Sequence, residues 1–418
     1  MSAVAWTAVG SLIVWVWLLL GQGFFWRTDQ RLPLRGDPAR WPSVAVVVPA
    51  RDEAEVLPVS LPSLLAQDYP GDAEIFLVDD GSGDGTGELA RELAVRYGGL
   101  PLTVVTPGEP EPGWTGKLWA LRHGMALARQ RRPEFLLLTD ADIAHEPDSL
   151  RELVAAAGSD GVDGLDLVSQ MARLRVTSAW ERLVVPAFVY FFGQLYPFRR
   201  VNGERSRTAA AAGGCVLLRA GTVERARLPE SIRSAVIDDV SLARAVRRSG
   251  GRIWLGLADR VDSVRPYPRL ADLWHMVARS AYAQLRHSPW LLAGTVLGLL
   301  LVYVAPPVTL VAGLLTGDAV AASAGGAAWA VMAGTYMPML GYYRQSLWLA
   351  PLLPLTAVLY LLMTVDSAVQ HYRGLGAAWK GRTSDRYKDA PGTLTPQPPV
   401  VTCGQAPRLC PNPRRSRG

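Results

Sequence analysis

The chain has 418 residues, of which 49% are hydrophobic, and its formal net charge is +6 at pH 7. This length is enough for two domains of ordinary size. The basic residues show no interleaved aromatic pattern and no helix-turn-helix signal, which argues against a nucleic-acid partner. Three cysteines, Cys215, Cys403 and Cys410, form no metal-ligand spacing, and only Cys215 lies in the polar central part, as expected for a reducing compartment.

An apolar segment without a charged residue runs from position 3 to position 26. It is long enough to cross a bilayer, and no Lys or Arg precedes it. A retained membrane anchor over residues 1–26 is therefore favoured over a cleaved secretory signal. A polar block follows, from about residue 27 to residue 287, and within it we predict a catalytic domain over residues 40–270.

Short apolar runs alternate with helical segments in the first part of this block. The alternation predicts an α/β fold with a mixed, mostly parallel sheet and helices on both faces. We predict strands at residues 43–48, 74–78, 102–105 and 134–138, and helices at 56–67, 87–97 and 117–130. The first strand is expected to end at Val48, because Pro49 and the charged residues after it do not suit a core strand.

Acidic turns follow three of the predicted strands, and they carry Asp52 and Glu53, Asp79 and Asp80, and Asp140 and Asp142. Open α/β sheets bind ligands at the carboxyl ends of their strands, so we expect these acids to converge on one crevice. The turns match neither the Gly-x-Gly-x-x-Gly fingerprint nor the P-loop, which disfavours a Rossmann dehydrogenase or a kinase.

Asp140 and Asp142 are the most informative pair. Two residues apart in extended chain, they can point the same way, and two carboxylates suit a hard cation such as Mg²⁺ or Mn²⁺ that holds a diphosphate. The competing interpretation is a pair of solvated loop acids. The other acidic turns at the same sheet edge favour the metal site.

A second acidic pair, Asp238 and Asp239, precedes an amphipathic helix predicted at residues 241–249. It is either a helix N-cap or the location of a general base, whose pKa a neighbouring acid would raise. Lys117 is a candidate contact to phosphates or a solvated residue at a helix start. The apolar, aromatic stretch at residues 183–198 is either core or an interfacial helix.

Three more uncharged segments, at residues 289–315, 319–343 and 346–365, predict membrane helices within residues 289–366. Basic residues cluster at their edges, so the positive-inside rule places the polar block and the tail in the cytoplasm of a multi-pass plasma-membrane protein. One span before the block and three after it would instead leave the tail outside. A re-entrant hairpin at Pro306 and Pro307, or one segment that does not span, would resolve the conflict. Residues 271–288 are predicted as an amphipathic interfacial segment, 367–389 as a basic juxtamembrane segment and 390–418 as a disordered tail.

The motif from Val46 to Glu53, the Val78-Asp79-Asp80-Gly81-Ser82 turn and Thr139-Asp140-Ala141-Asp142 together resemble the inverting family 2 glycosyltransferases of the GT-A fold. The resemblance covers about residues 44–265. The membrane layout and the segments at residues 113–120 and 379–383 are similar to the hopene-associated subgroup, which is linked to bacterial hopanoid biosynthesis.

The resemblance implies transfer of a sugar from a nucleotide-sugar donor, with a UDP-sugar expected, to a hydrophobic lipid acceptor. It implies a Mg²⁺ or Mn²⁺ ion at Asp140 and Asp142, and Asp239 as the catalytic base. The residues implied in nucleotide binding are Pro49, Arg51, Glu53, Asp79, Asp80, Lys117 and Asp140. Those implied in the donor and acceptor pocket are Gly213, Gly214, Asp238, Arg279 and Gln284.

Three alternatives are weighed against this interpretation. Processive polysaccharide synthases carry Gln-x-x-Arg-Trp before their membrane spans. Residues 275–286 hold Arg279, Tyr282 and Gln284 but not that motif, so single transfer is favoured. A nucleotidyltransferase would need a basic Gly-rich first turn, whereas residues 49–53 are acidic. A catalytically inactive membrane scaffold is the non-enzymatic alternative, and the intact acids at every predicted position argue against it.

Overall fold

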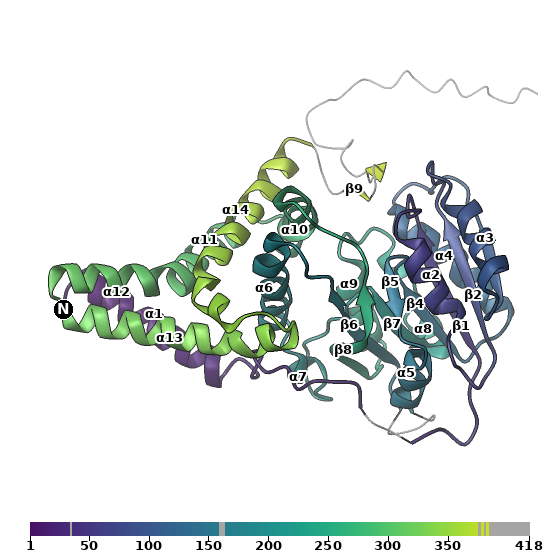
Figure 1. Cartoon of the computed structure of the whole chain (residues 1–418), viewed down its shortest axis with the longest axis horizontal. Coiled ribbons are helices and arrows are strands. Elements are labelled where there is room, and N and C mark those ends of the chain that lie inside the picture. Colours follow the sequence, from purple (N-terminus) through teal and green to yellow (C-terminus); the bar gives the residue numbers. More distant parts are fainter. Residues whose placement is uncertain (34–35, 159–163, 375–377, 380–381, 384–418) are drawn as a thin grey trace, which may run out of the picture.

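The computed structural model describes residues 1–33, 36–158, 164–374, 378–379 and 382–383. Figure 1 shows an α/β part at one end and a helical part that projects from it. A short antiparallel pair, β9 (Ala378–Trp379) and β10 (Arg382–Thr383), follows the last helix. The predicted tail, residues 390–418, and part of the predicted basic segment, residues 367–389, lie outside the described residues.

The α/β part is built on a mixed sheet of eight strands in the order β3-β2-β1-β4-β7-β6-β8-β5. Strands β1 to β4 are parallel, β7 is antiparallel to both of its neighbours, β6 and β8 are parallel, and β5 is antiparallel to β8. The predicted fold class, a mostly parallel sheet with helices, is confirmed. The bounds are β1 Val44–Ala50, β2 Ala73–Asp79, β3 Leu102–Val105, β4 Phe135–Thr139, β5 Ile143–His145, β6 Leu167–Leu174, β7 Cys215–Arg219 and β8 Ile253–Ser263.

The predicted end of the first strand was wrong, because β1 continues through Pro49 to Ala50. Even-numbered residues of β1 bond toward β2, as the hydrogen bond from the Asp80 N–H to the Ala50 carbonyl shows (2.9 Å). Pro49 therefore faces β4, where pairing has already stopped at Val47 and Leu138. A proline there breaks no ladder hydrogen bond, so the strand tolerates it.

Helices cover both faces of the sheet, as expected for buried, mostly parallel strands. Residues of α2, α3 and α5 pack in one apolar cluster with one face of the sheet, and residues of α4, α8 and α9 pack in a second cluster with the other face. The bounds are α2 Leu57–Leu65, α3 Thr86–Tyr97, α4 Gly116–Gln130, α5 Ser149–Ala157, α8 Ala220–Arg225, η1 Glu230–Ile232 and α9 Asp238–Arg248.

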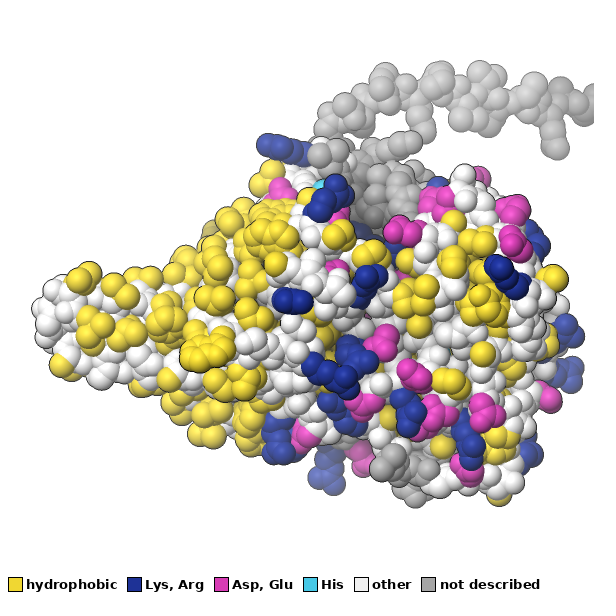
Figure 2. Space-filling model, viewed as in Figure 1, with side chains coloured by type: hydrophobic (Ala, Val, Ile, Leu, Met, Phe, Trp, Pro, Cys, Tyr) yellow, Lys and Arg dark blue, Asp and Glu magenta, His cyan; other side chains and the backbone are white. Residues whose placement is uncertain are grey.

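Three helical segments are long and apolar enough to cross a membrane, judged on length and composition: Ala3–Leu20, Pro289–Thr316 and Leu347–Tyr372. The bounds in this part are α1 Ala3–Leu20, α6 Ala179–Leu195, α7 Phe198–Val201, α10 Leu270–Gln284, α11 Pro289–Leu299, η2 Leu300–Val304, α12 Ala305–Thr316, α13 Ala319–Tyr342, η3 Leu347–Leu352 and α14 Leu353–Tyr372. Figure 2 shows hydrophobic side chains over the projecting end and a band of Lys and Arg side chains where it joins the α/β part.

Helix α13 is not among the three segments, although the sequence suggested that it spans. Its many Ala and Gly residues allow a close approach to α12 instead. A Cβ on Gly325 would lie 2.5 Å from Thr309 Oγ1, and a Cβ on Gly313 would lie 2.4 Å from the Ala322 nitrogen. Small residues of this kind are typical of contacts between membrane helices. Helices α1, α12 and α13 consequently run side by side (Figure 1).

The segment from α11 to α12 does not reverse at Pro306 and Pro307. A π-helical turn, η2, precedes the prolines and keeps the helix continuous. The carbonyls of Leu301 and Val302 in this turn accept hydrogen bonds from Ser11 Oγ (2.8 Å) and Trp15 Nε1 (2.6 Å) of α1. At the far end of the bundle, the Ser2 hydroxyl donates to Asp318, which begins α13 (2.5 Å).

The last apolar segment returns to the α/β part. Trp329 Nε1 of α13 donates to the Pro351 carbonyl (3.1 Å), so α14 starts beside the middle of α13. Helix α14 then packs along α10, and Tyr372 at its end lies 2.9 Å, hydroxyl to hydroxyl, from Tyr282. Helix α6 contains most of the aromatic stretch at residues 183–198, which was predicted to be either core or an interfacial helix. Val184 and Tyr190 are fully buried, so α6 is part of the core.

Glu181 of α6 ties the helical part to the chain that leaves β8. Its carboxylate accepts hydrogen bonds from the N–H groups of Thr177 (2.8 Å), Ser178 (2.8 Å) and Tyr267 (2.7 Å). Burial alone would raise the pKa of Glu181, but these donors hold it at about 2. Because the pKa is lowered in the folded protein, Glu181 stabilises the fold at every pH above the ordinary pKa of a glutamate. This contribution is lost as the pH falls toward 2.

We predict that Glu181→Gln lowers the free energy of unfolding at pH 7 by about 2 kcal/mol, because a neutral amide accepts weaker hydrogen bonds than a carboxylate. Denaturant titration of the detergent-solubilised protein, followed by circular dichroism, measures the difference. The matched control is Glu224→Gln, whose exposed ion pair with Arg129 contributes little. Equal midpoints for Glu181→Gln and the parent protein would contradict the assignment.

Candidate active site

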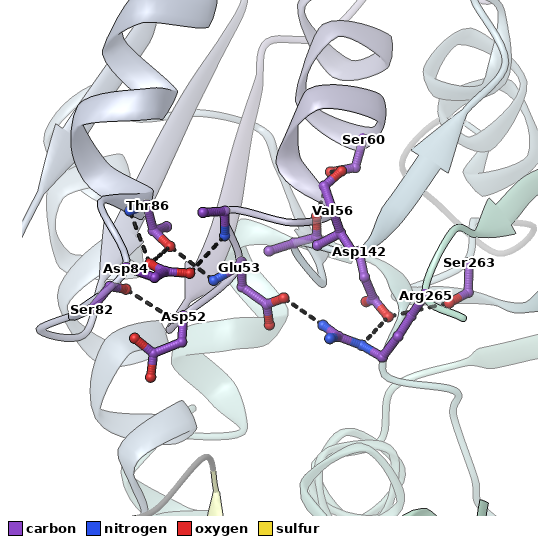
Figure 3. Close-up of polar contacts among 12 residues, drawn as sticks. Asp52, Glu53, Val56, Ser60, Ser82, Asp84, Thr86, Asp142, Ser263 and Arg265 are labelled. Atoms are coloured by element: carbon purple, nitrogen blue, oxygen red, sulfur yellow. Dashed lines mark hydrogen bonds and ion pairs between the residues drawn. The ribbon is translucent and has the colours of Figure 1, made fainter. Parts of the chain in front are cut away.

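The turns after β1 and β2 form one hydrogen-bonded unit. Backbone N–H groups of the first turn donate to side chains of the second, and Figure 3 shows these bonds. The pairs are Asp52 with Ser82 Oγ (2.9 Å), Glu53 with Thr86 Oγ1 (2.8 Å) and Ala54 with Asp84 Oδ2 (2.9 Å). Arg51, Glu53, Asp79 and Asp80, four of the predicted nucleotide-binding residues, therefore lie on or beside one hydrogen-bonded double turn.

Asp79 and Asp80 occupy the inner side of this double turn. Asp79 Oδ1 accepts a hydrogen bond from the Ser82 N–H (3.0 Å), and a Cβ on Gly87 would lie 2.6 Å from Asp79 Oδ2. Only glycine at position 87 therefore allows α3 to begin this close to the carboxylate. Arg51 donates to the Asp80 carbonyl and lies 3.4 Å from Asp80 Oδ2, so the structure brings these predicted residues together.

Lys117 connects the acids of two other elements. Its Nζ atom lies 2.8 Å from Asp140 Oδ1, after β4, and 3.3 Å from Asp238 Oδ2, in the first turn of α9. Burial alone would lower the pKa of Lys117, but the two carboxylates raise it above its ordinary value, so the ammonium stays charged. Lys117 is thus part of the acid cluster rather than a solvated residue at a helix start.

Arg265 pairs with the remaining acid of the Asp-Ala-Asp motif. Its Nε atom lies 3.0 Å from Asp142 Oδ2, and its Nη2 atom donates to Glu53 Oε2 (Figure 3). Ser263 Oγ adds a third hydrogen bond to Asp142 (3.2 Å). Arg265 was not predicted from the sequence, since a single arginine after a strand belongs to no recognisable motif.

Asp239 lies beside this cluster. Helix α9 begins at Asp238, three residues before the predicted start, so the acidic pair forms its first turn. Asp239 Oδ2 accepts from the Gly213 N–H (3.1 Å), and Oδ1 accepts from the Val240 N–H (2.7 Å). Burial first, and then the carboxylate of Asp238, raises the pKa of Asp239 to about 7. This value suits a general base that works near neutral pH.

The two glycines predicted in the pocket lie against the acids. A Cβ on Gly213 would come within 3.4 Å of Asp239 Cβ and 3.5 Å of Lys117 Nζ. The Gly214 carbonyl accepts from the Asp140 N–H (3.3 Å). The backbone thus lies close to charged side chains at Gly213, whereas a Cβ on Gly214 would meet the apolar side chain of Ile143 at 3.1 Å.

The two pocket residues predicted on α10 lie at the periphery. Arg279 is exposed, and its charge opposes the rise that burial causes in the pKa of Tyr267. Gln284 donates instead to the Tyr196 hydroxyl of the segment after α6. The described contacts therefore connect Gln284 to the helical part and not to the acid cluster.

His145 supports the acid-bearing turn from behind, a role that the sequence did not indicate. Its ring nitrogens lie 3.0 Å from Thr139 Oγ1 and 3.1 Å from Ser149 Oγ, on either side of the turn that carries Asp140 and Asp142. Burial lowers the pKa of His145 to about 4, so the ring is neutral at physiological pH. This buried ring fixes the turn without adding charge to it.

The residues present fit a divalent cation held jointly with a substrate. No group of three or more His, Cys, Asp or Glu side chains among the described residues is arranged to hold a metal alone. Mg²⁺-type sites, however, often use one or two carboxylates and complete their coordination with substrate phosphates and water. Burial, and then the nearby Asp142 carboxylate, raises the pKa of Asp140 despite Lys117, and an added cation would relieve this excess of negative charge.

We predict that Arg265→Met lowers the free energy of unfolding by about 3 kcal/mol, because Glu53 and Asp142 lose their shared cation in a partly buried site. Denaturant titration in a metal-free buffer measures the loss. Arg129→Met, which breaks an exposed pair with Glu224, is the control and should change stability by less than about 1 kcal/mol. Similar small losses for both variants would show that the pair with Arg265 contributes little.

Comparison with known proteins identifies the family of the chain. The family described as "Glycosyltransferase like family 2" matches residues 42–283. The beta-monoglucosyldiacylglycerol synthase of Synechocystis sp. is 30% identical over 197 residues, which are 42% of this chain and 39% of that protein. The undecaprenyl-phosphate 4-deoxy-4-formamido-L-arabinose transferase of Pseudomonas aeruginosa is 31% identical over 183 residues, 42% of this chain and 45% of that protein. The chain thus spans less than half the length of these relatives.

A solved structure shares the fold over most of the chain. The mannosyltransferase PcManGT from Pyrobaculum calidifontis, in complex with GDP-Man and Mn²⁺, superposes with a TM-score of 0.51 at 20% identity. The similarity covers 90% of this chain and 100% of that one.

Proposed function

Because the chain belongs to glycosyltransferase family 2, we propose that it is an inverting, metal-dependent enzyme that transfers a sugar from a nucleotide-sugar donor to a lipid hydroxyl. One observation carries the proposal. Lys117 links Asp140 to Asp238, and Asp239, with its raised pKa, follows directly. A phosphate-neutralising cation and a candidate base therefore lie within one cluster.

The donor nucleotide would bind on the double turn after β1 and β2. Glu53, Asp79 and Asp80 supply carboxylate acceptors, which suit the imide N–H of uracil and the hydroxyls of ribose. This chemistry favours a UDP-sugar. Arg51 holds the Asp80 turn in place, and Lys117 is positioned to neutralise the diphosphate.

The transfer step needs a proton acceptor and a stabilised leaving group. Asp239 takes the proton of the acceptor hydroxyl while that oxygen attacks the anomeric carbon and the bond from that carbon to the diphosphate breaks. The electron pair leaves with the nucleoside diphosphate, whose growing negative charge Lys117 opposes. A Mg²⁺ or Mn²⁺ ion at Asp140 and Asp142 would supply further Lewis-acid stabilisation of the leaving group when bound.

The helical part would place this site at a membrane surface. Three segments have the length and composition of membrane spans, and the relatives include a diacylglycerol-linked and an undecaprenyl-phosphate-linked transferase. In this arrangement α13 and α14 both end beside the α/β part. The α/β part and the end of α14 at Tyr372 would therefore lie on the same side of the bilayer. We place that face in the cytoplasm of a multi-pass plasma-membrane protein, because basic side chains gather at the junction (Figure 2).

The acceptor would be a hydrophobic lipid, related to hopanoids or to other isoprenoids. The segment from Gly113 to Ala120, which motivates this choice, begins at the turn before α4 and includes Lys117. Lipid profiling of a deletion strain, followed by assays with candidate UDP-sugars, tests the choice. Loss of one glycolipid would identify the acceptor.

We predict that Asp239→Asn lowers kcat by about 10²- to 10⁴-fold, because the acceptor hydroxyl loses its general base. The pH dependence gives a sharper test. A base acts when deprotonated, so the activity of the parent enzyme should fall as pH drops through the raised pKa of Asp239, about 7. Asp238→Asn removes the neighbouring negative charge and should move this fall in activity to lower pH. Full activity in Asp239→Asn would exclude the base assignment.

We predict that EDTA abolishes sugar transfer and that Mn²⁺ or Mg²⁺ restores it. Asp140→Asn and Asp142→Asn should each raise the metal concentration needed for half-maximal activity about tenfold or more, because each removes a hard anionic ligand. Asp148→Asn is the control, since Asp148 pairs with Arg260 outside the cluster and should leave the metal requirement unchanged. Undiminished turnover in EDTA would rule out the metal.

A further inference from the structure

A cavity of about 440 Å³ lies where the end of α13 meets the ends of β6 and β8. The wall consists of residues at and just after the ends of β6 (173–176), β8 (262–264) and α13 (342–344), together with Val59 of α2. The volume is in the range of small-ligand pockets. None of the residues assigned above to donor binding or to proton transfer lines this cavity.

The cavity wall is positively charged. It contains Arg173, Arg175 and Arg344 but only one carboxylate, that of Asp262. Arg173 Nε pairs with Asp262 Oδ1 at 2.8 Å. Arg175 and Arg344 are exposed and form no ion pair within the part of the chain that the structure describes. The unbalanced charge favours an anionic occupant.

Arg344 adopts a backbone conformation that glycine usually provides. Its φ is 53°, in the left-handed region, directly after the end of α13. Glycine or asparagine is usual at such a helix end, and a bulky residue is strained there. Arg132, Arg227 and Arg286 have the same backbone conformation, so it fixes where the Arg344 side chain begins and is not by itself a sign of function.

We propose that this cavity binds the phosphate group of an anionic membrane lipid, an inference that rests on the membrane placement proposed above. Arginine donors match phosphate oxygens. Leu174, Val176 and Val264 give the same wall an apolar part, and α13 of the membrane-side bundle ends in it. These features favour a lipid over free phosphate.

The lipid is a bound ligand and not the sugar acceptor. An acceptor hydroxyl must lie within hydrogen-bond reach of a base, and the only carboxylate in this wall, Asp262, is engaged by Arg173. Ser263 of the wall donates to Asp142 (3.2 Å), so the lipid would lie one side chain away from the metal-binding motif. The site would therefore connect lipid composition to the catalytic centre.

Native mass spectrometry of the full chain in detergent tests the proposal. Phosphatidylglycerol and phosphatidylcholine, with identical acyl chains, are added at equal concentrations. The parent protein should retain phosphatidylglycerol about tenfold more strongly. Phosphatidylglycerol has a net negative charge, whereas the choline group of phosphatidylcholine adds a positive charge that cancels the attraction to Arg175 and Arg344. The double variant Arg175→Gln/Arg344→Gln should lose the preference, because it removes both of these guanidinium groups from the cavity wall.

The matched control is Arg91→Gln/Arg96→Gln, which removes the same charge from α3 at the opposite side of the sheet order. It should keep the preference. Equal retention of the two lipids by the parent protein, or an unchanged preference in a folded Arg175→Gln/Arg344→Gln variant, would overturn the proposal. Displacement of phosphatidylglycerol by equimolar inorganic phosphate would assign the cavity to free phosphate and reject the lipid. The assay contains no sugar donor, so its failure is distinguishable from a failure of the proposed transferase activity.

Discussion

The ammonium group of Lys117 is the interaction on which the catalytic centre depends. It lies between Asp140, which follows β4, and Asp238, which begins α9, and Asp239 comes directly after Asp238. Carboxylates that converge in a partly buried crevice repel one another unless cations lie among them. Lys117 serves one side of the crevice, and Arg265 serves the other by joining Glu53 to Asp142. The sheet brings the acids to one edge, and Lys117 and Arg265 offset the electrostatic repulsion between their carboxylates.

The catalytic and helical parts share structural elements rather than a simple linker. Glu181, in the first turn of α6, holds the Tyr267 N–H, and Tyr267 is only two residues beyond Arg265. Helix α10 begins shortly afterwards and packs on α14, where the Tyr282 N–H donates to Ser367 Oγ (3.0 Å). A displacement of these helices would therefore reach the Asp142 ion pair through covalent chain and hydrogen bonds. This continuity suits the proposed transfer, in which the acceptor arrives through the bilayer.

The sequence predicted the parts of the fold that local pattern controls. Continuous apolar runs located the strands β1 to β4, and the acids after them marked the crevice because strand ends in a parallel sheet share one edge. Local pattern could not reveal Arg265 or His145, whose roles depend on neighbours distant in the chain. The end of β1 was predicted wrongly at Val48. The strand continues through Pro49 because β4 has no partner for it there, and strand pairing cannot be read from local sequence. Gln284 fitted a family position, but its contact with Tyr196 appears only once α6 and α10 are packed.

The contacts of helix α1 impose an order on how the protein is assembled. Ser11 and Trp15 donate to carbonyls that the π-helical turn at Leu300–Val304 leaves available, nearly three hundred residues later in the chain. Helix α1 therefore waits for these polar partners until the whole α/β part that follows it in the chain has been synthesised. Until then, its serine hydroxyl and indole N–H need other acceptors, because hydrocarbon offers none. Biogenesis of this chain is thus expected to depend on a late docking step in which α1 joins the helices that follow the α/β part.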